Sequence, residues 1–293
     1  MGTELSKAVV DGILTGGVYA LMAAGLTLIF GVMEIINIAQ GIFVVLAAYL
    51  SYVLQIHFGI DPFIGLIITM PVMFGVGVLI EWGFVRRLKA QNRSALSILV
   101  TFAVAIVIEG ILTQFFSADL RIIKAWYVDK SVHVFGFYLP YIYLLGFGLA
   151  VVLLAALYVF LYRSRSGKSI RASVQNRTGA ELIGININRV SAITFGIGAA
   201  VTAAGGMVFG ATNSFNPNSG YDLISRLLVI VVLGGLGSIG GALVAAVVAL
   251  VIEDVTAVLW SPIWASTMFF AVLVVVLLVR PNGLFGQTAV RAQ

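Results

Sequence analysis

The sequence contains no cysteine, only two histidines and few charged residues, and these shortages exclude several classes of protein. Without cysteine, the 293 residues can hold no disulfide framework and no thiolate metal site. His57 and His133 are too isolated to form a histidine metal cluster. Charged residues make up 10% of the chain and hydrophobic residues 61%, against about 25% and roughly 45–50% in soluble domains. A water-soluble surface cannot be built from this composition.

Long apolar runs occupy most of the chain. A run of about 18 or more residues can cross a hydrocarbon core of about 30 Å as a helix. A β-barrel would instead need segments of about ten residues that alternate in polarity, whereas 150–160 is apolar on every face. We therefore predict an all-α integral membrane protein, a polytopic bundle of about eight spans that forms one transmembrane domain over 1–293. The expected spans are 9–32, 36–56, 62–84, 95–116, 139–162, 190–212, 226–252 and 263–280.

The placement of positive charge predicts which loops face the cytoplasm. More than half of the 17 Lys and Arg residues lie in two connections, 85–94 and 163–190. Short loops rich in Lys and Arg stay on the cytoplasmic side, so both connections are predicted to be cytoplasmic and 117–138 external. This distribution explains the net charge of +5 without a nucleic-acid partner.

The segment 226–252 allows two interpretations because glycines interrupt it. It could be one tilted helix, in which case the basic C-terminus would lie outside. It could instead be a re-entrant pair of half-helices around GGLGSIGG, which places Glu253 and Asp254 outside and the C-terminus inside. The charge rule favours the re-entrant form. Either way, the glycines of this segment are expected to pack closely against neighbouring helices: Gly234, Gly235, Gly237, Gly240 and Gly241.

No catalytic motif stands out in the sequence. The string RSRSGKS at 163–169 ends in the GKS of a phosphate-binding loop. However, Tyr162 stands where that motif has its first glycine, and a membrane span precedes the string where a strand is required. No Ser-His-Asp set, Cys-His set or HExxH motif occurs. We expect no enzyme activity, no bound metal and no cofactor in this chain.

Polar residues inside or beside apolar runs are the candidates for a solute pathway. Asn37 and Gln40, three apart, would share a helix face and could contact either a solute or a neighbouring helix. Glu109 could line a pathway or extend its carboxylate to the membrane interface. Asn213 and Asn216 belong to a polar cluster that could form an external mouth or only a solvated turn.

Four stretches of the chain resemble, nearly end to end, the membrane-spanning permease subunits of high-affinity branched-chain amino acid ABC importers. They are GGVYALMAAGLTLIFGVMEIINIAQG at 16–41, SGKSIRASVQNRTGAELIGININRV at 166–190, FGIGAAVTAAGGMVFG at 195–210, and VLGGLGSIGGALVAAVVALVIE at 232–253 with the ending RPNGLFG. Gln40 stands where this family usually has histidine. Related permeases also carry urea, short amides and other small acids, so these solutes remain alternatives.

The resemblance implies a set of partners and a site for them. It implies a transport subunit of a prokaryotic plasma (inner) membrane that pairs with a second permease, binds two cytoplasmic ATPase subunits, and receives solute from an external binding protein. ATP and Mg would be bound by the ATPase subunits. The cytoplasmic loop 163–190 would be the coupling element, with one helix over 171–184 carrying or adjoining Arg171, Arg177, Glu181 and Gly184. On one regular helix Arg171 and Glu181 lie too far apart to pair, so each would find a partner at the headgroups or on an ATPase.

Two other transport functions compete with this interpretation. An ion-coupled secondary transporter also uses interrupted helices, but it usually keeps carboxylates near mid-membrane, and Glu109 is the main candidate here. A passive channel for a small solute would need no ATPase.

The predicted topology can be tested with single cysteines, because the chain has none of its own. Ser131→Cys should react with a membrane-impermeant thiol reagent in intact cells, and Ser169→Cys should react only after the cells are broken. The reverse labelling pattern would contradict the topology.

Overall fold

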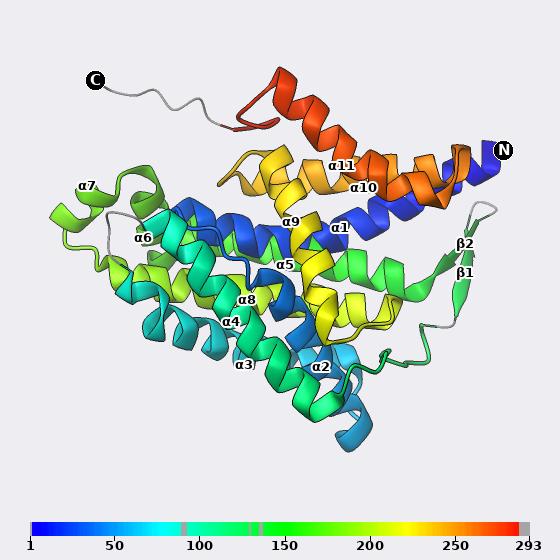
Figure 1. The fold of residues 1–293 in the computed structure, drawn as a ribbon, viewed down its shortest axis with the longest axis horizontal. Helices are drawn as coiled ribbons and strands as arrows, with labels where there is room; N and C mark the ends of the chain where they lie inside the picture. Colours follow the sequence, from blue (N-terminus) through cyan, green and yellow to red (C-terminus); the bar gives the residue numbers. More distant parts are fainter. Residues whose placement is uncertain (1, 89–92, 129, 135–136, 287–293) are drawn as a thin grey trace.

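The computed structural model describes residues 2–88, 93–128, 130–134 and 137–286, and most of them are helical (Figure 1). The predicted loops 85–94 and 117–138 fall partly outside the described residues. Within the described part, eight helices are long and apolar enough to cross a membrane, which confirms the predicted all-α polytopic class. They are α1 (Gly2–Met33), α2 (Gln40–Phe58), α3 (Pro62–Gly83), α4 (Arg93–Phe116), α5 (Tyr141–Arg163), α8 (Ile187–Thr212), α10 (Ile239–Leu259) and α11 (Pro262–Val279).

Shorter elements connect these spans. The helices α6 (Arg165–Gln175) and α7 (Arg177–Leu182) lie between α5 and α8, and α9 (Gly220–Gly234) lies between α8 and α10. Two short 3₁₀ turns, η1 (Val85–Arg87) and η3 (Pro217–Ser219), follow α3 and precede α9. The strands β1 (Ser131–Val134) and β2 (Phe137–Pro140) form an antiparallel pair, which the sequence did not predict.

Local sequence determines where several helices begin and end. The side chain of Asp61 caps α3 and Pro62 occupies its first position, where no backbone N–H is needed. The side chains of Ser164 and Asn186 cap α6 and α8 in the same way. Gly59 ends α2 with φ of 64°, a left-handed conformation that glycine adopts without steric cost.

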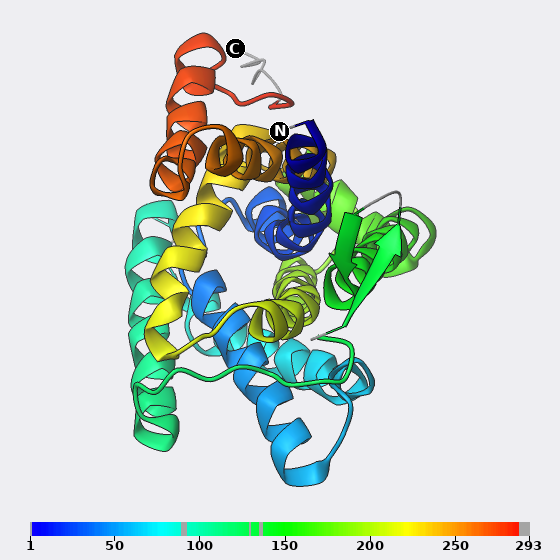
Figure 2. The same ribbon diagram turned by 90° about the vertical axis from the view of Figure 1, so that its right-hand side faces the viewer.

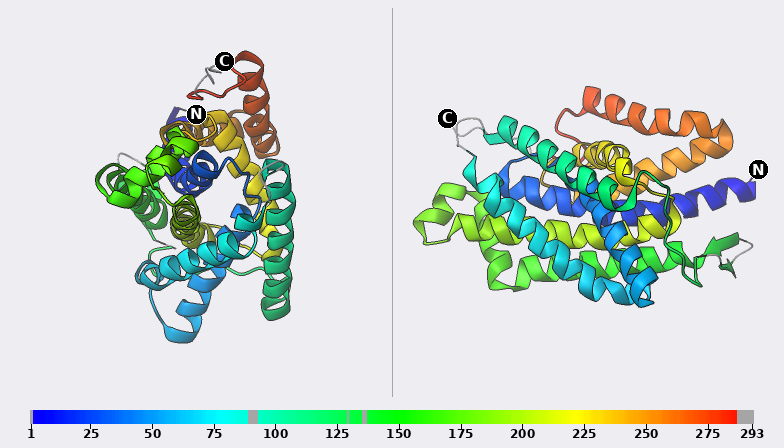
Figure 3. Two further views of the ribbon diagram at one scale, coloured as in Figure 1. Left: turned by 90° about the vertical axis from the view of Figure 1, so that its left-hand side faces the viewer. Right: turned by 60° about the horizontal axis from the view of Figure 1, so that its bottom comes forward.

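The helices form a bundle with a densely packed middle. Viewed along the bundle, α1 and α8 lie centrally, whereas α4 and α11 lie at the periphery (Figures 2 and 3). Of the 18 residues that form the most apolar stretch of each helix, 78% are buried in α1 and in α8, against 11% in α11. The outer helices therefore offer apolar surface to hydrocarbon, and the central ones build the core.

Glycines in α1 let α10 approach very closely. A Cβ atom at Gly12 would lie 2.6 Å from the Cα of Val251, and one at Gly16 would lie 2.7 Å from the Cα of Val247. Since hydrocarbon provides no hydrophobic drive between helices, such small-residue contacts are the means by which membrane helices pack.

The two ends of the bundle differ in structure. The helices α6 and α7 lie at one end, and the β1–β2 hairpin lies at the other (Figure 1). This arrangement agrees with the predicted placement of 163–190 and 117–138 on opposite sides of a membrane. We call these the α6–α7 end and the hairpin end.

The connection between α1 and α2 differs from the prediction of a span beginning at residue 36. After α1 ends at Met33, residues 34–39 are irregular, and α2 begins only at Gln40. Ile35 and Asn37 in this connection are fully buried. Irregular backbone can be tolerated inside a bundle because other helices cover it and supply hydrogen bonds. Here the backbone N–H of Ile38 donates to Thr101 Oγ1 of α4 at 3.1 Å.

The predicted segment 226–252 consists of two helices rather than one. α9 ends at Gly234, and α10 begins at Ile239. The turn between them uses Gly235 and Gly237, whose φ angles of 96° and 84° favour glycine. A pair of half-helices is not confirmed, because α10 with 21 residues is long enough to cross a membrane alone. α9 has 15 residues and crosses the bundle at a steep angle to α10 (Figure 1).

The five glycines that were expected to pack helices have different surroundings. A Cβ atom at Gly234 would come within 2.5 Å of the start of α10, and one at Gly241 would meet the carbonyl oxygen of Gly234. Gly235 faces the backbone that follows α11. Gly237 meets only α1, at 3.5 Å, and a Cβ at Gly240 would meet no heavy atom within 4 Å. Close packing in this turn therefore involves three of the five.

Neighbouring glycines at the start of α10 provide a matched test. Gly241→Ala should lower the free energy of unfolding by about 1–3 kcal/mol, because its methyl group would press on the end of α9. Gly240→Ala should be neutral or stabilise the helix by up to about 1 kcal/mol. Thermal unfolding in detergent measures both, and equal stability of the two variants would contradict the packing role of Gly241.

Candidate functional site

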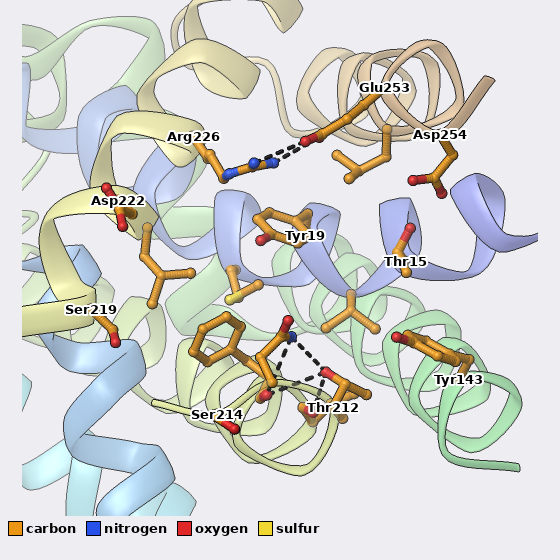
Figure 4. A pocket seen from close by; sticks show the side chains of 17 residues that line it. Thr15, Tyr19, Tyr143, Thr212, Ser214, Ser219, Asp222, Arg226, Glu253 and Asp254 are labelled. Atoms are coloured by element: carbon orange, nitrogen blue, oxygen red, sulfur yellow. Dashed lines mark hydrogen bonds and ion pairs between the residues drawn. The ribbon is translucent and has the colours of Figure 1, made fainter. Parts of the chain in front are cut away.

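A cavity of about 400 Å³ lies among the helices of the bundle (Figure 4). Tyr143 lines it from the first turn of α5, directly after β2, and Thr212 and Asn213 line it from the end of α8. α1, α9 and α10 form the remaining walls. Its volume is within the range of about 300–1,000 Å³ that is usual for small-molecule sites.

The cavity has both charged and apolar walls. Its charged residues are Asp222 and Arg226 of α9 and Glu253 and Asp254 of α10. Six apolar side chains also line it: Val18, Met22, Val208, Phe209, Leu223 and Leu250. A small molecule that carries charge at one end and a hydrocarbon group at the other fits such a lining.

Arg226 and Glu253 form the strongest polar contact in the cavity. The two guanidinium nitrogens of Arg226 donate to the two carboxylate oxygens of Glu253 at 2.7 and 2.8 Å. Arg226 also donates to Ser266 Oγ at 3.3 Å and lies 5.2 Å from the ring centre of Phe269, both in α11. The two charged side chains are only 23% and 11% exposed. This fork-like pair therefore joins α9 to α10, and its contacts to α11 join a third helix.

Asp222 and Asp254 are placed differently. Asp222 lies one helical turn before Arg226, and Asp254 lies beside Thr15 on the other side of the ion pair (Figure 4). Among the residues that the structure describes, neither carboxylate forms a hydrogen bond or an ion pair. The carboxylate of Asp222, next to Arg226, is therefore free to accept hydrogen bonds from a bound molecule.

Asn37 and Gln40, predicted as pathway residues, lie in a buried polar network away from this cavity. Asn37 Nδ2 donates to Gln40 Oε1 at 3.0 Å, and Gln40 Nε2 donates to Thr202 Oγ1 of α8. Both amides are fully buried. The predicted shared helix face is wrong, because Asn37 precedes α2. The contacts match the alternative in which the two amides join helices.

The other three pathway candidates have different surroundings. Asn213 lines the cavity. Asn216 caps η3 through its contacts with Asn218 and Ser219. Glu109 of α4 accepts a hydrogen bond from the hydroxyl of Tyr221 at 2.6 Å and so connects α4 to α9. Only one of the five predicted pathway residues therefore lines the cavity.

The predicted coupling helix over 171–184 is wrong, because Asn176 ends α6 and caps α7. Arg171 donates from Nε to the carbonyl of Leu161 at 3.0 Å and lies over the ring of Tyr162. Glu181 lies 3.8 Å from Arg177, and both side chains are largely exposed. The expectation that Arg171 and Glu181 need partners outside the chain is also wrong. Gly184 follows α7 with φ of 86°.

Sequence reasoning did not single out Arg226, and it treated Glu253 and Asp254 only as an external acidic pair. A signal was present, because Arg226 interrupts the run LISRLLVIVV and Glu253 and Asp254 interrupt ALVIEDVTAV. Charges inside apolar runs on both sides of a glycine turn are expected to pair across it. Thr15, Tyr19 and Tyr143 of the cavity carry no such signal.

The ion pair can be tested by removing one charge or both. Arg226→Met leaves the Glu253 carboxylate buried without its partner and should cost about 3–5 kcal/mol of stability. The double variant Arg226→Met with Glu253→Leu should cost clearly less, because no charge remains unpaired. Thermal unfolding in detergent compares them. A double variant less stable than the single one would show that the charges themselves hold α9 in place.

Comparisons with known proteins agree with the membrane architecture. Residues 8–277 match the family model described as branched-chain amino acid transport system, permease component. The high-affinity branched-chain amino acid transport system permease protein BraD of Pseudomonas aeruginosa is 27% identical over 97% of this chain and 96% of its own length. The LivH protein of Salmonella typhimurium, with the same description, is 30% identical over 96% and 95%. A probable LivH protein of Methanocaldococcus jannaschii is 25% identical over 96% and 92%.

No solved structure matches the chain significantly. The family model nevertheless covers nearly all of the membrane-spanning helices, from α1 to α11. The chain belongs to the family of permease components of branched-chain amino acid transport systems.

Proposed function

We propose that this chain forms part of the translocation pathway for branched-chain amino acids, or for a related small polar solute, in an ATP-driven importer of the plasma membrane. It would act with a second, related permease, two cytoplasmic ATPase subunits that bind ATP and Mg, and an external solute-binding protein. The observation that carries this proposal is the cavity at the hairpin end. It has charged and apolar walls, is bounded by α1, α5, α8, α9 and α10, and lies toward the predicted external side, where a binding protein would deliver solute.

The α6–α7 end supports docking of an ATPase. Leu182 and Ile183 at the end of α7 are 83% and 75% exposed. Exposed apolar side chains of this size on the tip of a short helix favour burial against a partner protein. The string GKS lies within α6 rather than in a loop after a strand, so it does not have the context of a phosphate-binding loop. ATP hydrolysis would therefore be supplied by another chain.

Reconstitution into proteoliposomes tests the proposal. The complete set of subunits should accumulate tritiated L-leucine when the leucine-loaded binding protein is on one side and ATP with Mg is on the other. Omission of the ATPase subunits should abolish accumulation. Uptake by this chain alone, downhill or driven by an ion gradient, would contradict the proposal and support the channel or the ion-coupled transporter.

A substitution at the α6–α7 end tests the proposed ATPase contact in the same system. Leu182→Glu should weaken association with the ATPase subunits about tenfold or more, because it places a charge in the apolar contact. Leu120→Glu is the matched control, since Leu120 is 69% exposed on the loop before the hairpin. Normal assembly and normal ATP-driven uptake with Leu182→Glu would place the contact elsewhere.

A further inference from the structure

The charged wall of the cavity contains an unusual pair on α9. Asp222 and Arg226 are four residues apart, so their side chains leave the same face of the helix about 6 Å apart along its axis. Opposite charges at this spacing commonly pair with each other. Here Arg226 pairs with Glu253 of the neighbouring helix α10 instead. A free carboxylate and a guanidinium group therefore line the cavity side by side.

Arg226 retains donors for a ligand. A guanidinium group has five N–H donors in a fixed plane. Its hydrogen-bond partners are the two oxygens of Glu253 and the hydroxyl of Ser266, which leaves N–H groups that form no hydrogen bond among the described residues. Since Glu253 occupies the fork of the two terminal nitrogens, a ligand carboxylate would use these remaining N–H groups.

We propose that the cavity is an amino-acid-binding site within this chain, in which Asp222 accepts the α-ammonium group and Arg226 binds the α-carboxylate. The two groups are attached to the same carbon of the ligand, so they can meet two residues that lie one helical turn apart. The hydrocarbon side chain of the ligand lies against Val18, Met22, Val208, Phe209, Leu223 and Leu250. This inference rests on the proposed function and makes Asp222 and Arg226 its specificity-determining residues.

The chemistry of this site decides between the solutes that remain open. Urea and short amides carry no charge and would leave both Asp222 and Arg226 without a partner. A simple organic acid could bind Arg226 but would bring a second negative charge close to Asp222. An α-amino acid satisfies both residues, and an apolar side chain fills the remaining wall.

Direct binding to the complete transporter in lipid nanodiscs tests the site, without the binding protein and without ATP. The probe is tritiated L-leucine, displaced by unlabelled leucine, by isoamylamine, which lacks the carboxylate, or by isocaproate, which lacks the ammonium group. Leucine should displace the probe about tenfold or more better than either analogue, since each charge-assisted contact contributes at least that much. Absence of leucine binding to the unsubstituted complex would overturn the inference.

Substitutions in this chain alone separate a specific site from general charge. Asp222→Asn should remove the preference for leucine over isocaproate, because only the ammonium contact is lost. Arg226→Lys keeps the charge but has fewer N–H donors, so it cannot hold Glu253 and a ligand carboxylate as Arg226 does, and should reduce the preference for leucine over isoamylamine. Asp254→Asn is the matched control: it removes the same charge from the same cavity on the other side of the ion pair, and should leave both preferences unchanged.

The outcomes distinguish this inference from the proposed function. Equal effects of Asp222→Asn and Asp254→Asn would mean that the cavity acts only through its negative charge, which overturns the assignment. An unchanged ranking of ligands in Asp222→Asn would also overturn it. ATP-driven leucine uptake by the unsubstituted complex is measured separately, so its absence would contradict the proposed function. Normal uptake with no effect of Asp222→Asn would contradict only the site.

Discussion

The ion pair between Arg226 and Glu253 is the contact on which the arrangement of the cavity depends. A lone charge at membrane depth is costly, because hydrocarbon offers no hydrogen bonds and no screening. By binding each other through two hydrogen bonds, the two side chains supply each other's polar partner, and α9 is held against α10. The same pairing keeps Arg226 away from Asp222. One contact therefore positions a helix and leaves a carboxylate free for a ligand.

Close backbone packing positions the helices that form the cavity. α9 can turn into α10 only because Gly235 and Gly237 adopt left-handed conformations. Gly12 and Gly16 then bring α1 onto α10, so that Thr15 and Tyr19, which lie in the same part of α1, reach the cavity. Small residues thus determine where larger polar side chains are placed.

The long helix α8 connects the two ends of the bundle. It begins shortly after α7 and ends at Thr212, which lines the cavity. With 26 residues it is about 39 Å long. Because its middle is buried among the central helices, a displacement of α6 and α7 by an ATPase would be transmitted to the cavity wall through a stiff element. This geometry joins the proposed coupling end to the proposed binding end without any side chain that reaches both.

The sequence alone determined the class of the protein, because composition and the length of apolar runs decide whether a chain lies in lipid. It also predicted opposite ends for 163–190 and 117–138 from their charge. It did not predict that 34–39 would be irregular and buried, because its covering helices come from distant parts of the chain. The sequence singled out Asn37 and Gln40 as polar residues that could contact a neighbouring helix. Only tertiary packing decided that Thr202 would be the partner of Gln40. Arg226 and Glu253 are 27 residues apart and became a pair only when the glycine turn folded α9 onto α10. Local sequence determines helices and their ends, whereas a site made of side chains from five helices depends on how those helices pack.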